Sequence, residues 1–220
     1  MSAAAHRQPQ NALDVAAIFP SIDEELAPFA HLFRGRVLNA GAGNRDISAL
    51  IDGELVNQDI AEGLHNERID ILSPLDRIPV HDAYFDGIIC NAVLEHVENP
   101  EDVVAEFARV CRPGGVLYLT VPFLQPEHLD PSDYQRYTAD GLRGLVARHG
   151  FDVVSCDSPH NVYATLAWIA VEWLREAPGL RGKVLRRTVI PSLRRAARRP
   201  GRNVHSIASA YRVVARRASV

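Results

Sequence analysis

Apolar residues follow two patterns along the chain, and each pattern predicts a different secondary-structure element. Short continuous apolar runs between turn residues predict strands, over residues 36–40, 54–58, 67–72, 86–90, 115–121 and 151–156. Apolar residues three and four apart predict helices, over residues 45–51, 100–111 and 138–149. Because strands and helices take turns, the chain is predicted to form a mostly parallel sheet with helices on both faces.

Capping signals place two of the helix starts. Ser21 with Glu24 three residues later forms a capping box, and the helix behind it is predicted to reach about Phe33. Asn99 and Pro100 precede two acidic residues and predict the cap and first turn of the helix at 100–111.

The alternation breaks after residue 157. Residues 161–175 read as an aromatic-rich helix, the arginine-rich segment 181–202 carries apolar residues at helical spacing, and residues 208–217 alternate like a last strand. The chain is therefore divided into four parts. These are an N-terminal tail or lid at 1–20, a core at 21–157, a helical basic insertion at 158–207 and the last core strand at 208–217.

Composition indicates one globular domain in a reducing compartment. The 220 residues are 47% hydrophobic, which is enough to bury a core. The sequence contains no run of 18 apolar residues, so no membrane-spanning helix is predicted. Cys90, Cys111 and Cys156 each lie in an apolar run, as expected of buried thiols, so a cytoplasmic location is expected.

Charge is unevenly distributed along the chain. Residues 1–176 hold 27 acidic and 12 basic groups, whereas residues 177–220 hold 12 basic groups and no acidic group. This split predicts a basic surface near the C-terminus. A membrane surface, a nucleic acid and the acidic body of the protein itself all fit such a surface. No zinc motif or base-stacking pattern is present, so nucleic acid is the disfavoured partner.

A glycine-rich turn follows the first strand and is the first candidate for ligand binding. Gly41 and Gly43 let the backbone turn sharply and approach a ligand, at the sheet edge where α/β proteins bind ligands. Asp59 ends the next strand, sixteen positions after Gly43, where a carboxylate accepts both hydroxyls of a ribose. A nicotinamide-dinucleotide site has the same spacing, but its third glycine is absent here.

Two later segments raise a specific resemblance. Residues 85–97 contain Leu-Glu-His-Val and residues 109–117 contain Arg-Val-x-x-Pro-Gly-Gly. In this order they resemble the class I S-adenosylmethionine-dependent methyltransferases, and the resemblance runs from about Val37 to Val154. It implies a Rossmann-like seven-stranded sheet whose last strand is antiparallel. It also implies S-adenosylmethionine as cofactor and an N-terminal helix that either crosses the cofactor mouth or packs on the sheet.

The resemblance also implies a set of cofactor-binding residues. Asn39 stands where the family usually has a carboxylate, and Pro74 stands where an adenine-contacting aspartate is common, with Asp70 as the competing position. The implied cofactor-binding residues are Asn39, Ala40, Gly41, Gly43, Asn44, Asp59, Ile60, Ser73, Leu75 and Asn91.

A metal is left open but not indicated. Some quinone-pathway relatives hold a divalent ion with one glutamate and a Glu-His pair. Glu95 and His96 match that pair, whereas Ala92 replaces the first glutamate. Mg²⁺ would therefore need other ligands, from the region of Asp130.

Candidate catalytic residues cluster after the fourth and fifth strands. The segment 122–138 resembles a subgroup found beside surface-polysaccharide and glycan pathways. A hydroxyl acceptor needs a base, and the candidates are His96, His128, Asp130, Asp133 and Tyr134. Glu127 and Asp130 are expected to fix the tautomer of His128, whereas Glu95 is expected to point elsewhere along a helix. Pairing of Arg136 with Asp133, which would tie down the loop, is the preferred reading of those two residues.

The sequence therefore predicts a methyltransferase that acts on a hydroxyl of a small molecule, with a sugar, oligosaccharide or glycolipid precursor as acceptor. The alternatives are an O- or N-methyltransferase of a secondary metabolite and a cofactor-binding scaffold without transfer activity. Peripheral membrane contact through the basic segment and a homodimer are left open.

Overall fold

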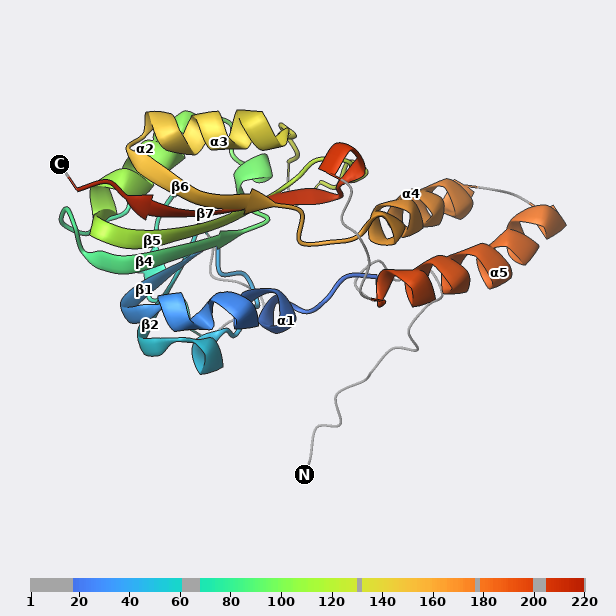
Figure 1. Cartoon of the computed structure of the whole chain (residues 1–220), viewed down its shortest axis with the longest axis horizontal. Helices are drawn as coiled ribbons and strands as arrows, with labels where there is room; N and C mark the ends of the chain where they lie inside the picture. The colour runs from blue at the N-terminus through green and yellow to red at the C-terminus, as the bar shows by residue number, and fades with distance from the viewer. Residues whose placement is uncertain (1–17, 61–67, 130–131, 177–178, 200–204, 220) are drawn as a thin grey trace, which may run out of the picture.

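A seven-stranded sheet forms the centre of the protein (Figure 1). The computed structural model describes residues 18–60, 68–129, 132–176, 179–199 and 205–219. The strand order is β3-β2-β1-β4-β5-β7-β6. The strands are β1 (Arg34–Ala40), β2 (Asp52–Asp59), β3 (Ile71–Leu72), β4 (Phe85–Asn91), β5 (Cys111–Pro122), β6 (Phe151–Asp157) and β7 (Ala210–Arg217).

Six pairings join the seven strands, and their directions are those that the resemblance implied. Strands β1 to β5 pair only in parallel with one another, whereas β7 is inserted between β5 and β6 and runs antiparallel to both. The fold class is confirmed. The carboxyl ends of β1, β2, β4 and β5 consequently meet at one edge of the sheet.

Helices cover both faces of the sheet (Figure 1). Helices α2 (Pro100–Val110) and α3 (Ala139–Arg148) pack on one face, where Phe107 and Leu142 are fully buried. The helix α1 (Ile22–Leu26) and the 3-10 helix η2 (Ala27–Leu32) pack on the other face, around buried Leu26 and Phe33. Full burial of a side chain of this size contributes about 1.5–3 kcal/mol, so each layer is fixed by a few such residues. The N-terminal helix thus packs on the sheet.

The capping box predicted at Ser21 is confirmed for α1, and α3 also begins with a side-chain cap. Ser21 accepts from the Glu24 amide while Glu24 accepts from the Ser21 amide. Thr138 accepts from the Gly141 amide at the start of α3. Asn99 occupies the N-cap position of α2 but makes no side-chain cap bond.

The predicted helix over residues 45–51 is wrong. Only a 3-10 turn, η3 (Ser48–Leu50), forms there. The Asp46 carboxylate accepts from the Ser48 amide, which offers the backbone a local alternative to a helix. Strand β2 already begins at Asp52, so no room remains for a second helical turn.

Three other elements differ in extent from the prediction. The N-terminal α-helix ends at Leu26 and continues as η2, because Pro28 lacks an amide hydrogen for the helical ladder. Strand β3 is confined to Ile71–Leu72, since the Asp70 carboxylate takes the Asn57 amide in place of a ladder bond. Strand β5 begins early, at Cys111, and a register shift opposite Phe85 and Gly87 absorbs the Pro-Gly-Gly segment.

A helical hairpin projects from one end of the sheet (Figure 1). It consists of α4 (Val162–Glu176) and α5 (Gly179–Ala197), packed around buried Val171, Leu174 and Ile190. Asn161 joins its two ends, because its amide group donates to Ala197 O and its oxygen accepts from the Tyr163 amide. Among the described residues, no helix is both long and apolar enough to cross a membrane.

Candidate functional site

The turn after β1 is shaped by two glycines with positive φ. Gly41 has φ +62° and Gly43 has φ +52°, in the left-handed region that favours glycine. A Cβ on Gly41 would lie 2.6 Å from a methyl group of Val93, so the turn packs tightly there. Among the described residues, a Cβ on Gly43 would meet nothing within 4 Å. The turn is therefore closed toward β4, and a ligand is expected on its other side.

Side chains at the end of β2 hold this turn. The Gly41 amide donates to Gln58 Oε1 at 3.0 Å, and the Gly43 amide donates to Asp59 Oδ2 at 2.9 Å. Gln58 is fully buried and also donates to Ser73 O, which links the turn to the segment after β3. The role of Gln58 was missed by the sequence reasoning. Its signal is a glutamine within a buried strand run, a residue that must find partners when buried.

Arg45 lies in the crevice between the ends of β1 and β4, and it too was missed. Its guanidinium donates to the carbonyl oxygens of Gly41, Ala42 and Asn91. Burial lowers the pKa of this guanidinium from its ordinary value. A cationic group thus bridges the glycine turn and the residue that ends β4. Three carbonyl oxygens at this edge are therefore arranged to accept from a cation.

The chain leaves β4 through a strained residue. Ala92 has φ +53°, which a non-glycine residue adopts only when its surroundings enforce it. Thr120 of β5 enforces it, because the Ala92 amide donates both to Thr120 O and to Thr120 Oγ1 at 3.1 Å. Thr120 Oγ1 in turn donates to Asn91 Oδ1. Asn91 is thereby fixed at the carboxyl edge, opposite the glycine turn.

The remaining cofactor candidates fall into two groups. Asn39 and Ala40 are buried in β1, and the Asn39 amide group donates to Asn57 Oδ1 at 2.9 Å. Asn44 is exposed in the turn.

The residues expected to contact the adenine follow the ends of β2 and β3. Ile60 is 66% exposed, whereas Ser73 and Leu75 are buried. Ser73 Oγ accepts and donates no hydrogen bond in the described structure. Asp70, the competing candidate, is engaged by the Asn57 amide at 2.8 Å.

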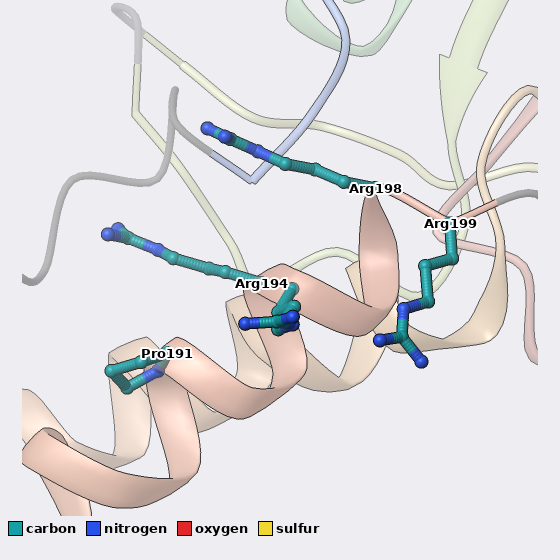
Figure 2. A pocket seen from close by; sticks show the side chains of 5 residues that line it. Pro191, Arg194, Arg198 and Arg199 are labelled. Carbon is teal, nitrogen blue, oxygen red and sulfur yellow. The ribbon is translucent and has the colours of Figure 1, made fainter.

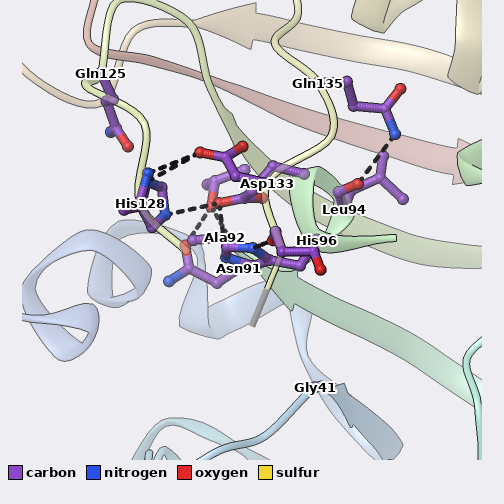
Figure 3. A network of polar contacts seen from close by, with 12 residues as sticks. Gly41, Asn91, Ala92, Leu94, His96, Gln125, His128, Asp133 and Gln135 are labelled. Carbon is purple, nitrogen blue, oxygen red and sulfur yellow. Dashed lines mark hydrogen bonds and ion pairs between the residues drawn. The ribbon is translucent and has the colours of Figure 1, made fainter. Parts of the chain in front are cut away.

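His96 and His128 meet above the ends of β4 and β5 (Figure 3), and Glu95 lies beside both of them. His96 belongs to the 3-10 turn η4 (Leu94–His96), and His128 belongs to the loop after β5. Their ring centroids lie 5.1 Å apart. Each Nε2 is 3.8 Å from Glu95 Oε1. The expectation that Glu95 points elsewhere along a helix is wrong, because residues 94–96 form one 3-10 turn and not an α-helix.

Loop 123–138 is clamped over this cluster by charged side chains. Arg136 pairs with Asp133, as expected, and also donates to Pro126 O. Asp133 accepts from the His128 amide at 2.9 Å. The Asp133–Arg136 pair lowers the pKa of Asp133 to about 2, with the His128 amide adding to the effect.

Other neighbours complete the setting of the cluster. Asp133 and Pro126, not Glu127, lie beside Nδ1 of His128, since Glu127 is exposed. The Tyr134 amide donates to Glu95 O, but its side chain is 54% exposed and makes no hydrogen bond with the described residues. Trp168 of α4 lies 5.6 Å from the His128 ring, so the hairpin borders the site. The candidate Asp130 lies outside the described residues.

Glu95 is the most deeply buried ionisable group of the cluster. Its side chain has no exposed surface, and neither carboxylate oxygen accepts a hydrogen bond from the described residues. Burial raises the pKa of Glu95, and its own backbone amide together with His96 and Arg136 opposes that rise. The cluster thus combines two accessible imidazoles with one desolvated carboxylate.

Comparison with known proteins agrees with this geometry. Residues 38–119 match the family model of a methyltransferase domain. No curated protein matched the sequence.

Solved structures with the same fold are numerous. The [4+2]-cyclase SpnF is 15% identical at a TM-score of 0.60, over 90% of this chain and 80% of its own. The 1,6-didemethyltoxoflavin-N1-methyltransferase of Burkholderia thailandensis is 17% identical at 0.58, over 94% and 80%. An S-adenosylmethionine-dependent methyltransferase of Archaeoglobus fulgidus is 16% identical at 0.57, over 89% and 92%.

Residues 38–119 thus match a methyltransferase domain, and the sheet around them has the fold of solved S-adenosylmethionine-dependent methyltransferases. This match agrees with S-adenosylmethionine as the cofactor that the sequence predicted. The similar structures differ widely in chemistry, and one of them is described as a cyclase. The fold therefore leaves the acceptor to be argued from the site itself.

Proposed function

We propose that the protein methylates a hydroxyl group of a carbohydrate or glycolipid precursor. The observation that carries the proposal is the pair of imidazoles, from the loops after β4 and β5, that face one buried carboxylate at the carboxyl edge of the sheet. This is the edge at which the glycine turn and Asp59 would hold the cofactor. Donor and acceptor sites would thus lie side by side.

The cofactor half rests on groups that remain free to bind. Asp59 accepts one backbone bond on each oxygen, from Gly43 and from Ile60 at 2.9 and 2.7 Å. A carboxylate has about four acceptor positions in total, so each oxygen retains one for a ribose hydroxyl.

Arg45 and the carbonyl oxygens that it contacts would bind the amino-acid end of the cofactor. That end carries an ammonium and a carboxylate, and the carbonyl oxygens of Gly41 and Asn91 now accept from the Arg45 guanidinium. In the complex the ammonium would take those acceptors, and the displaced guanidinium would pair with the carboxylate. Such pairs of guanidinium and carboxylate are strong because both partners are charged.

The acceptor half rests on proton transfer. S-adenosylmethionine supplies an electrophilic methyl group on a sulfonium, so positioning of the acceptor provides much of the rate. A hydroxyl must also lose its proton as it attacks, and a neutral imidazole suits this task near neutral pH. The Nδ1 atoms of His96 and His128 face backbone carbonyls, which leaves each Nε2 toward the acceptor.

A carbohydrate acceptor agrees with the polarity of this mouth. His128, which is 31% exposed, and Gln125 of the same loop offer donors and acceptors there (Figure 3). Sugar hydroxyls need such partners, and unpaired polar groups in a closed site are costly.

A cytoplasmic location remains our prediction and rests on three free, buried cysteines.

The test is methyl transfer from radiolabelled S-adenosylmethionine to a panel of acceptors. We expect label in free or lipid-linked saccharides with an open hydroxyl and none in the same saccharides with that position already methylated. Catechols and small amines serve as the comparison acceptors. Transfer to amines alone would contradict the proposal and support an N-methyltransferase, and tight cofactor binding without transfer to any acceptor would support a scaffold.

A further inference from the structure

Three potential ligand atoms converge at the Glu95, His96 and His128 cluster. One atom from each side chain lies within 4.8 Å of the other two. The Glu95 side chain has no exposed surface, and its two oxygens accept no hydrogen bond from the described residues. Buried polar groups in proteins almost always have partners, and an isolated buried carboxylate is especially costly. Its surroundings therefore call for a cationic partner.

The distances suit a shared ion better than direct hydrogen bonds. Each imidazole Nε2 lies 3.8 Å from Glu95 Oε1, which is beyond hydrogen-bonding distance. Two ligands that each bind zinc at about 2.0–2.2 Å can lie up to about 4.2 Å apart. Both separations satisfy this limit, and a small rotation of one ring would bring the three atoms around a single ion.

Both imidazoles are already oriented as ligands. His96 Nδ1 contacts Ser132 O and His128 Nδ1 lies 3.3 Å from Pro126 O. A carbonyl oxygen only accepts, so the proton of each neutral ring belongs on Nδ1, and the lone pair belongs on Nε2. Metal-binding histidines typically make such a second hydrogen bond, which fixes their tautomer.

We propose that Glu95, His96 and His128 bind one divalent transition-metal ion. Two imidazoles and one carboxylate favour Zn²⁺, Co²⁺ or Fe²⁺ over Mg²⁺, which prefers oxygen ligands. His128 thereby supplies what the missing glutamate at Ala92 does not. Three protein ligands leave positions open for an oxygen of water or acceptor, and His96 and His128 are 15% and 31% exposed, which gives that oxygen access.

The test measures binding without methyl transfer, so its outcome is independent of the proposed acceptor. Tag-free protein is stripped with chelator and titrated with Co²⁺, whose visible absorption reports ligation, and with Zn²⁺ in a calorimeter. We expect one ion per chain. E95Q and H128A are each expected to weaken binding by about a hundredfold or more, above the 10–100-fold typical of outer-sphere changes.

His149 provides the matched control. It contacts Glu101 directly at 2.6 Å and has no third ligand, so H149A should bind the ion like the parent. Circular dichroism checks that each variant is folded. Absence of ion binding by the parent, or equal binding by the parent and a folded H128A, would overturn the proposal.

A second, independent observation concerns the outer surface of the α4–α5 hairpin. Apolar side chains are exposed on both helices, with Trp173 at 61% and Leu180 at 76%. The others on this surface are Tyr163, Leu166, Ile169 and Val184. Exposed apolar groups gathered on one element mark an interaction site.

Basic side chains flank these apolar groups. Helix α5 and the residues after it to Arg199 contain no acidic residue. Six of its cations form no ion pair within the described part of the chain, namely Arg181, Lys183, Arg187, Arg195, Arg198 and Arg199. The acidic residues in the described part of the chain therefore form no direct ion pairs with these six cations. Near the end of α5, Pro191 and four arginines line a hollow of about 450 Å³, and Figure 2 shows Arg194 and Arg198 extended side by side.

We infer that this hairpin docks on an anionic phospholipid surface. Cations alone would suit a nucleic acid equally well, but exposed tryptophan and aliphatic side chains beside the cations favour the interface of a bilayer. Trp168 of the same hairpin borders His128. Docking would therefore bring the acceptor mouth toward lipid-linked substrates.

The test is sedimentation with vesicles of phosphatidylcholine alone or mixed equally with phosphatidylglycerol. We expect binding only to the anionic vesicles, with a blue shift of tryptophan emission. Replacing Arg195, Arg198 and Arg199 by glutamine should weaken it at least about tenfold, whereas the exposed Arg34 on the sheet serves as a control, R34Q. Equal binding to both vesicles, preference for an RNA oligonucleotide, or burial of the hairpin in a homodimer would overturn the inference.

Discussion

Replacing Asp59 by alanine is expected to weaken the binding of S-adenosylhomocysteine at least about tenfold. Hydrogen bonds to a charged group contribute about 1.5–3 kcal/mol each, and about 1.4 kcal/mol corresponds to a tenfold change in affinity. The carboxylate also holds the Gly43 amide at 2.9 Å, so its loss would loosen the glycine turn as well as remove ribose contacts.

Calorimetry with the parent and the variant measures this change. D46A is the matched control, because Asp46 lies in the same turn, is exposed, and contacts Ser48 and Arg68 but no other charged or polar group among the described residues. Unchanged affinity of D59A would remove Asp59 from the ribose site. Heat on addition of NADH to the parent would instead favour the dinucleotide reading of the glycine turn.

The fold was predictable because its signals are local and strong. The face of α2, with Val103 and Phe107, repeats at helical spacing, and both side chains are buried as expected. The last strand was also predicted, although β7 lies between two strands and is buried along most of its length, where alternation suggests only one buried face. The apolar pattern predicted the wrong element, or the wrong length of an element, where a side chain took the place of a backbone hydrogen-bond acceptor. Asp46 and Asp70 each capture an amide in this way, and neither effect can be read from periodicity.

The site was only partly predictable, for a different reason. His96 and His128 could be placed near each other because loops after neighbouring parallel strands emerge at the same edge. The position of Glu95 depended on whether residues 94–96 formed an α-helix or a single tight turn, and the sequence led us to expect the helix. Arg45 reaches back across the crevice to Asn91, a contact 46 residues apart in the chain. Such contacts follow from tertiary packing alone.

The geometry of the cluster also changes how its residues should be compared. From sequence, His96 and His128 compete for the role of base. In the structure both Nε2 atoms face the same buried oxygen of Glu95 at 3.8 Å. They therefore form one unit, in which each ring supports the other either in accepting the proton or in holding an ion next to the acceptor oxygen.

Alanine in place of either His96 or His128 is accordingly expected to lower turnover by about a hundredfold or more, which lies within the range typical of general-base catalysis. Affinity for S-adenosylhomocysteine should be retained, because neither ring contacts the glycine turn or Asp59 in the described structure. Imidazole ordinarily gains its proton between about pH 5 and 8, and protonation removes the lone pair that the acceptor needs. The parent should therefore lose turnover toward acid pH, and this acidic limb should flatten in both variants.

The measurement is a pH–rate profile of radiolabel transfer for the parent, H96A, H128A and the control H81A. The His81 ring is exposed and contacts Asp82 O and the ring of Tyr84, away from the cluster. If both alanine variants keep turnover within about threefold of the parent, which is far below the effect of a general base, then neither imidazole serves the acceptor. Loss of turnover in only one variant would assign the role of base to that ring and leave the other ring a packing role in the site. Equal loss in both, with cofactor affinity unchanged, is the result expected of a single unit built around Glu95.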